Sequence, residues 1–185
     1  MRILCVASGE SLTLDDLNFC KGKVKTYAVS DVYKLAPWAD LLYSADHGWW
    51  SYHNGAPRFN GEKWTCDRMA ANEYNLNRIR YSNSALWSHD RSVVASGGNS
   101  GFQCMNLADL HGATEIILLG YDYGFKHKKH FFGGHPPQIN RHSNYADWLR
   151  RLKLAQPFIN ARVINCTPNS NIDFFERANI RDVLL

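Results

Sequence analysis

The stretch Glu115-Ile116-Ile117-Leu118-Leu119-Gly120-Tyr121-Asp122 is the most strand-like run in the chain. Four consecutive aliphatic residues form its centre, and a continuous apolar run is typical of a strand buried on both faces in the middle of a parallel sheet. The run ends in Gly120 followed by polar and aromatic residues, which favours a turn. The stretch therefore predicts a central parallel strand whose carboxyl end bears polar side chains.

Working outward from this strand, the chain alternates between strand and helix patterns. Apolar runs predict further strands at 2–7, 24–30, 41–46 and 161–167. Apolar residues at helical spacing predict helices over 102–111 and 143–156, with a short helix at 180–185. Such alternation predicts an α/β fold with a mostly parallel sheet and helices on both faces. Residues 47–92 are harder to interpret, although Asn60-Gly61 predicts a hairpin turn there.

The composition is that of a globular protein. Hydrophobic residues make up 45% and charged residues 21% of the 185 residues, which disfavours disorder and coiled coil and predicts a single domain over 1–185. No apolar run approaches the ~20 residues of a membrane helix, and the first residues are too strand-like for a signal peptide. Five scattered cysteines without a C-x-x-C pair predict neither a zinc ribbon nor a disulfide framework, so we expect a cytoplasmic protein. The net charge of +4 does not by itself indicate a nucleic-acid binder.

In sheets of this kind, ligands bind beyond the carboxyl ends of the strands. The predicted strand ends bear a dense set of polar residues, namely Ser8-Gly9-Glu10-Ser11, Asp31, Asp46, Tyr121-Asp122-Tyr123 and Thr167-Pro168-Asn169-Ser170. The glycine-rich loop Gly97-Gly98-Asn99-Ser100-Gly101 adds to the same edge. We therefore expect the functional site there. Each aspartate could be a catalytic carboxylate or the cap of the following turn.

A glycine-rich loop that opens a helix presents backbone N–H groups and a positive dipole end to an anion. Residues 97–101 fit that description, and residues 8–11 are interpreted in the same way. Neither loop matches the Walker A motif or G-x-G-x-x-G. The alternative is ordinary turn chemistry with Asn99 or Ser100 as a helix cap. Together on one edge, the two loops favour a nucleotide ligand.

Residues 126–137, Lys-His-Lys-Lys-His-Phe-Phe-Gly-Gly-His-Pro-Pro, form the chemically richest segment. A histidine there could act as a general base, and the lysines could neutralise phosphates. The histidine spacing matches no standard metal site, so no metal is predicted. The alternative is a solvated basic loop. A second open choice concerns a group of tryptophans that serve either as core filling or as a stacking platform: Trp38, Trp49, Trp50 and Trp64.

Several blocks of this sequence resemble the core signature of bacterial lipooligosaccharide sialyltransferases. The resemblance rests on residues 97–105, 107–108 and 112–123, on His130-Phe131-Phe132-Gly133-Gly134-His135, and on Cys166-Thr167-Pro168-Asn169-Ser170 with Phe174-Phe175. Ser8-Gly9-Glu10-Ser11-Leu12 is similar to the family's first loop. The blocks keep their order over nearly the whole chain, and the pattern also resembles small proteins of phages and prophages.

The resemblance implies a Rossmann-like, metal-independent glycosyltransferase that uses a nucleotide-sugar as co-substrate and no other cofactor. It implies that His135, or His130 because of an inserted glycine, is the general base and that Tyr123 stabilises the leaving phosphate. Lysines on the same side are expected to contact the phosphate or the acceptor: Lys126, Lys128 and Lys129. The residues implied in nucleotide binding are Ser8, Gly9, Glu10, Ser11, Asp31, Asn99, Ser100, Gly101, Asp122, Asn169 and Ser170.

The sequence departs from the family at Ser8 and Asp31, where the family has asparagines, and in a shorter segment between Asp122 and His135. The departures at Ser8 and Asp31 leave the base and the sugar of the donor open. The acceptor is expected to be a glycan or nucleic acid such as modified phage DNA, since Arg141, Arg150 and Arg151 add basic charge. The alternatives are a pyrophosphokinase acting on a small alcohol and a protein that sequesters a nucleotide without turnover. The oligomeric state is left open.

Overall fold

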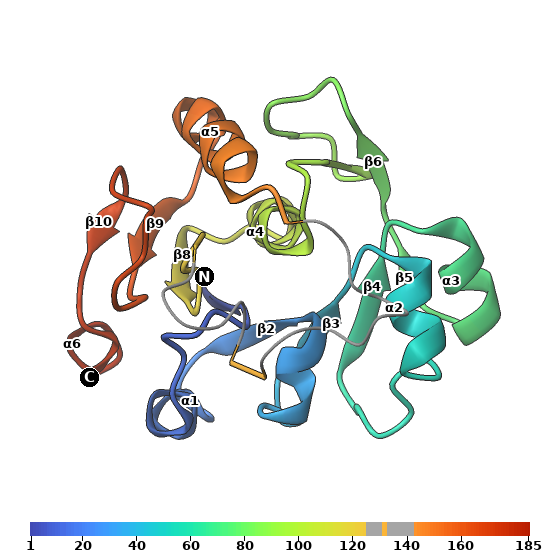
Figure 1. Ribbon diagram of the computed structural model, residues 1–185, viewed down its shortest axis with the longest axis horizontal. Helices are drawn as coiled ribbons and strands as arrows, with labels where there is room; N and C mark the ends of the chain where they lie inside the picture. Colours follow the sequence, from blue (N-terminus) through green and yellow to red (C-terminus); the bar gives the residue numbers. More distant parts are fainter. Residues whose placement is uncertain (125–130, 133–142) are drawn as a thin grey trace.

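A computed structural model describes residues 1–124, 131–132 and 143–185. Eight strands form the main sheet in the order β10-β9-β8-β1-β2-β3-β4-β5 (Figure 1). Their bounds are β1 (Arg2–Val6), β2 (Lys25–Val29), β3 (Leu41–Tyr43), β4 (Glu62–Thr65), β5 (Asn77–Arg78), β8 (Glu115–Leu119), β9 (Arg162–Asn165) and β10 (Glu176–Arg177). A separate pair consists of β6 (Arg80–Ser82) and β7 (Val93–Ala95).

Every strand pair in the described part of the chain is parallel, which confirms the predicted α/β fold with a mostly parallel sheet. The predicted hairpin at Asn60-Gly61 is wrong, because β4 runs parallel to β3 with Leu41 opposite Glu62. Gly61 serves another purpose there. A Cβ on it would lie 2.5 Å from the Asp40 carbonyl oxygen, so glycine lets the chain pass close to that backbone.

Helices cover both faces of the sheet, as predicted. Their bounds are α1 (Leu14–Cys20), η1 (Ser30–Lys34), α2 (His47–Tyr52), α3 (Arg68–Tyr74), α4 (Ser100–Leu110), α5 (Tyr145–Ala155), η2 (Gln156–Phe158) and α6 (Ile180–Val183). In Figure 1, α4 and α5 lie on one side of the sheet and α1 and α6 on the other. The expected helices at 102–111, 143–156 and 180–185 correspond to α4, α5 and α6.

Each face of the sheet has its own apolar layer. Alternate residues of β1 point to opposite sides, so Ile3 and Cys5 join the layer under α4, while Leu4 and Val6 join the layer over α1 and η1. Within the second layer Trp50 is fully buried and Trp49 almost so. These two tryptophans therefore serve as core filling, one of the two roles that the sequence left open.

Side-chain caps define where the helices begin. Asn99 caps α4 by accepting from the Phe102 N–H, and Thr13 caps α1 by accepting from the Asp16 N–H. Because α1 begins only at Leu14, the loop of residues 8–11 does not open a helix, and that interpretation is corrected. The loop is held instead by contacts with the loop after β8.

The chain reverses direction across the sheet between β1 and β8. From β1 it builds outward to β5, then returns through α4 to place β8 on the other side of β1. The loops that follow β1 and β8 therefore meet, and the Gly9 N–H donates to the Gly120 carbonyl at 2.9 Å. Gly120 has φ +71°, and a Cβ on it would lie 2.1 Å from the Ala7 carbonyl oxygen. This reversal point is where α/β sheets commonly bind ligands.

Gly120→Ala should destabilise the protein by about 3 kcal/mol or more, because a left-handed alanine is combined with a backbone clash. Gly22→Ala is the matched control: its φ is +75°, but nothing lies within 4 Å of the added Cβ. We expect this control to cost only about 1 kcal/mol. Urea unfolding measures both, and equal costs for the two variants would contradict the close approach of the loops.

Candidate functional site

The beginning of α4 meets two strand-end loops at the carboxyl edge of the sheet. Ser100 Oγ accepts from the Ala45 N–H at 3.1 Å, which ties the helix to the loop after β3. Asn99 Nδ2 donates to the Tyr123 hydroxyl at 3.4 Å, which ties it to the loop after β8. Residues that the sequence placed on one edge are thus brought together there, and their contacts fix the position of the helix start.

The glycine-rich loop before α4 has a conformation that requires glycine. Gly97 and Gly98 have φ of +55° and +85°, and a Cβ on Gly97 would lie 2.0 Å from the Phe102 ring. Asn99 then satisfies one N–H of the first turn as the helix cap. The other first-turn N–H groups have no acceptor within the helix by α-helical geometry. The sequence analysis gave the Asn99 cap and an anion site as alternatives. Because Asn99 Oδ1 engages only the Phe102 N–H, the helix start can have both.

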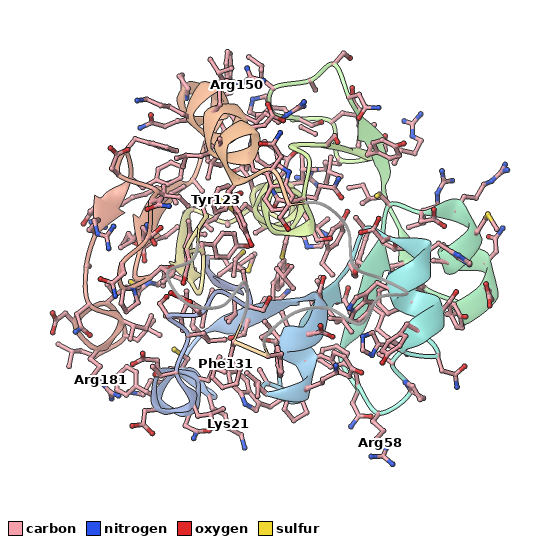
Figure 2. All side chains as sticks on the ribbon, in the orientation of Figure 1. Lys21, Arg58, Tyr123, Phe131, Arg150 and Arg181 are labelled. Carbon is pink, nitrogen blue, oxygen red and sulfur yellow. The ribbon has the colours of Figure 1, made fainter. Side chains whose placement is uncertain are left out.

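Tyr123 lies beside this helix start, as the label in Figure 2 shows. Its ring stacks on Tyr121 with 6.4 Å between centroids and 14° between planes. Burial raises the pKa of the Tyr123 phenol, so the hydroxyl keeps its proton and remains a donor. Tyr121 in turn donates to the Gly101 carbonyl at 3.1 Å. Together these contacts hold a protonated hydroxyl next to the first turn of α4.

Asp122 ties the loop after β1 to the loop after β8. Its carboxylate accepts from the Ser11 N–H at 2.9 Å and from Ser11 Oγ at 2.6 Å. Burial is the largest influence on the carboxyl and raises its pKa, while both bonds from Ser11 act in the opposite direction. Gly9 packs so closely that a Cβ on it would lie 2.2 Å from the carboxylate. The residues predicted to bind the nucleotide here also hold each other in place.

The loop after β9 supports the same edge from the other side. Ser170 Oγ donates to the Tyr121 carbonyl at 2.6 Å, whereas Asn169 is exposed at φ +57°. Asn171 makes two bonds, from its N–H to the Asp122 carbonyl at 2.9 Å and from Nδ2 to the Tyr123 carbonyl at 3.0 Å. The sequence analysis missed Asn171, because nothing in its local pattern marks a residue whose partners lie 48 and 49 positions away.

Asp31 follows β2 directly and is only 6% exposed. One of its carboxylate oxygens lies 3.0 Å from Lys34 Nζ and 3.0 Å from His53 Nε2. His53, which follows α2, is a titratable residue that the sequence analysis also missed. No motif links it to Asp31, and only the adjacency of β2 and β3 brings η1 and α2 together.

Helix α5 covers the glycine-rich loop. A Cβ on Gly98 would lie 2.9 Å from Trp148 Cδ1 and 3.9 Å from Arg151 Cδ. Arg151 and Arg150 both pair with Asp147, at 2.6 and 2.7 Å. From its spacing, the sequence analysis placed Trp148 on the apolar face of a helix. In the structure its ring lies over the glycine-rich loop, with the Arg151 side chain nearby, at the rim of the site.

Six of the residues named in the predictions lie outside the described residues: Lys126, Lys128, Lys129, His130, His135 and Arg141. Between them, Phe131 is described, and its N–H donates to the Ser8 carbonyl at 2.8 Å. Its side chain packs against the apolar layer that contains α1, near the place labelled in Figure 2. Phe131 therefore lies beside the loop after β1.

Comparison with protein-family models, with curated proteins and with solved structures gives no match for this chain. In residues 1–124, 131–132 and 143–185, no group of three or more His, Cys, Asp or Glu is arranged to hold a metal ion. No helix in the same ranges has the length and apolar character needed to cross a membrane. What the site binds is therefore inferred from its own chemistry.

Ser11→Ala should raise the pKa of Asp122 further and reduce the free energy of unfolding by about 1–2 kcal/mol, because the bond from Ser11 Oγ, one of the two that lower this pKa, is lost. A raised folded-state pKa contributes stability that is fully present below the unfolded pKa and is lost as the pH rises through the folded value. The stability loss on raising the pH should therefore be larger in the variant.

Carboxyl-carbon NMR titration of Asp122 and urea unfolding at several pH values check both expectations. Ser84→Ala, which removes an exposed hydroxyl bonded to Ser82, is the control and should leave Asp122 unchanged. An unchanged or lowered Asp122 pKa in Ser11→Ala would contradict the assigned contact.

Proposed function

We propose that this protein is a metal-independent glycosyltransferase that moves a sugar from a nucleotide-sugar to an acceptor hydroxyl. The observation that carries the proposal is the meeting of the α4 start with the loops after β3 and β8, through Ser100 and through Asn99 with Tyr123. Helix N–H groups beside a protonated phenol form an environment suited to the phosphate that leaves in such a reaction. The resemblance of the sequence blocks to a glycosyltransferase family supports the same reaction class.

In the proposed reaction the acceptor oxygen attacks the anomeric carbon of the donor sugar, and the bond from that carbon to the phosphate oxygen breaks. A general base takes the proton of the acceptor hydroxyl. On the sequence resemblance this base is His135, with His130 as the alternative. The charge that develops on the phosphate is stabilised by the first N–H groups of α4, by Tyr123, and by lysines of the same segment: Lys126, Lys128 and Lys129.

The acceptor is proposed to be a glycan or a nucleic acid. Lys126–Lys129 and Arg141 add positive charge close in sequence to the proposed base, which suits an anionic acceptor of either kind. The two acceptors differ in their response to salt. Binding of a nucleic acid releases counterions, so its affinity falls steeply as the salt concentration rises. Acceptor trials at two salt concentrations therefore separate them.

A thermal-shift screen over CMP, UDP, GDP, ADP and their sugar conjugates tests the donor. A ligand at about 100 times its Kd should add about 2.7 kcal/mol of apparent stability, with or without EDTA. A flat screen on folded protein would overturn the nucleotide site. A requirement for ATP and Mg²⁺ would instead indicate pyrophosphoryl transfer.

Tyr123→Phe should weaken binding of the stabilising nucleotide by about 10-fold, because one donor to a charged phosphate is removed without changing the ring. Tyr52→Phe is the matched control, since Tyr52 is 49% exposed. Isothermal titration calorimetry measures both. Equal affinity in the two variants would remove Tyr123 from the phosphate subsite.

His135→Ala should lower the rate of sugar transfer by about 100-fold or more. It should change nucleotide affinity by no more than about twofold, since a general base acts on the acceptor and not on donor binding. Product analysis measures the transfer rate, and calorimetry on the same preparation measures the nucleotide affinity. If transfer is never detected and His135→Ala behaves as the parent protein does, a nucleotide-sequestering protein becomes the better description.

A further inference from the structure

Gln103 lies at the centre of a buried polar network behind the glycine-rich loop. The residue is only 5% exposed, and its neighbours on α4 belong to the apolar core. Its Oε1 accepts from the Tyr43 hydroxyl at 2.6 Å, and its Nε2 donates to the Ser96 carbonyl at 3.0 Å. The Cys66 thiol donates to the same Oε1 at 3.5 Å. Burial of an amide costs free energy unless its groups are hydrogen-bonded, and here both ends of the amide are engaged.

The partners of this network require an amide at position 103. Burial raises the pKa of the Tyr43 phenol and of the Cys66 thiol, so both groups keep their protons and act as donors. The Ser96 carbonyl can only accept. A glutamine side chain supplies an acceptor oxygen and a donor N–H together, whereas an ionised glutamate lacks the donor and a methionine has only a weak acceptor. The partners therefore orient the amide, with its oxygen toward β3 and its nitrogen toward the residue that precedes the glycine-rich loop.

The network holds one end of the glycine-rich loop, and Ser100 holds the other. Ser96 directly precedes Gly97, and its carbonyl is bonded to the amide of α4. At the far end, Ser100 Oγ accepts from the Ala45 N–H at 3.1 Å. Tyr43 ends β3, and Ala45 follows it by two residues. Both ends of the loop are therefore tied to the same strand end.

These two attachments matter because the loop between them contains glycines at positive φ, namely Gly97 and Gly98. Glycine adopts many backbone conformations readily, so a loop of this kind is ordered by its attachments and not by its own residues. If one attachment is lost, the start of α4 presents its N–H groups in the binding arrangement for only a fraction of the time. The apparent affinity for a ligand falls by that fraction.

We propose that Gln103 is the positioning residue of the phosphate subsite, because its amide links Tyr43 to Ser96 and so holds the loop that leads into the first turn of α4. This inference rests on the proposed nucleotide site and deepens it. It makes recognition of the phosphate, and not of the nucleoside, the part of binding that depends on Gln103. The residue acts through the loop and does not itself touch the ligand.

The test measures the phosphate increment, defined as the Kd of a nucleoside divided by the Kd of its diphosphate, on the full chain. The diphosphate is the one that gives the largest thermal shift. Calorimetry measures its Kd, and NMR titration measures the weaker binding of the nucleoside. Gln103→Met keeps an unbranched side chain of similar length and should lower the increment by about 10-fold. The Kd of the nucleoside should change by no more than about twofold, whereas a general loss of packing would weaken both ligands together.

Two tyrosines provide a matched pair of milder variants. Tyr43 and Tyr27 are fully buried on the neighbouring strands β3 and β2, and each hydroxyl is hydrogen-bonded to a side chain of the α4 region. The partner of Tyr43 is Gln103, near the start of the helix, and the partner of Tyr27 is His111, which follows its end. Tyr43→Phe should lower the phosphate increment by about threefold. Tyr27→Phe, which also loses one buried bond, should leave the increment unchanged.

The outcomes separate this inference from the proposed function. If the parent protein shows a phosphate increment that Gln103→Met retains, or if the two tyrosine variants behave alike, the inference is overturned while the nucleotide site stands. If the parent protein binds the diphosphate no more tightly than the nucleoside, the phosphate subsite of the proposed function fails, and this inference fails with it. If Gln103→Met does not fold, the tyrosine pair is the deciding comparison.

Discussion

The close approach of the loops after β1 and β8 is the constraint on which the rest of the carboxyl edge depends. Since the chain returns to pair β8 with β1, these two loops must pass each other with little room. Gly9 and Gly120 make this passage feasible, because a Cβ on either would lie 2.1–2.2 Å from an oxygen atom. Asp122 then fills the space and binds Ser11. The same contact fixes Tyr123, so the geometry of the candidate site follows from the packing of the sheet.

Helix α4 joins the core to the site. Its residues from Gly101 to Ala108 are all buried, because the helix lies against the sheet on one side and is flanked by β7. Burial of that length fixes the helix axis, and the contacts of Ser100 and Asn99 then fix its first turn. Donors held in this way need little rearrangement when charge develops on a bound phosphate. A helix start with an exposed, loosely packed body would lack this property.

The polar residues of the edge divide into two kinds. Asp122, Ser170 and Asn171 mainly hold loops to one another, since their side chains are engaged by backbone groups or by Ser11. The start of α4 instead presents N–H groups that have no acceptor within the helix.

The sequence by itself determined the features that depend on neighbouring residues. The apolar run Ile116–Leu119 identified a buried parallel strand, helical spacing identified α4 and α5, and Asn99 was recognised as a candidate cap. Tertiary structure decided what neighbours cannot encode. Asn60-Gly61 has the residues of a hairpin, yet the strands that flank it, β3 and β4, pair in parallel and not antiparallel. His53, Trp148 and Asn171 reach the edge only through the strand order, which brings together residues distant in sequence and is set by burial of the whole sheet.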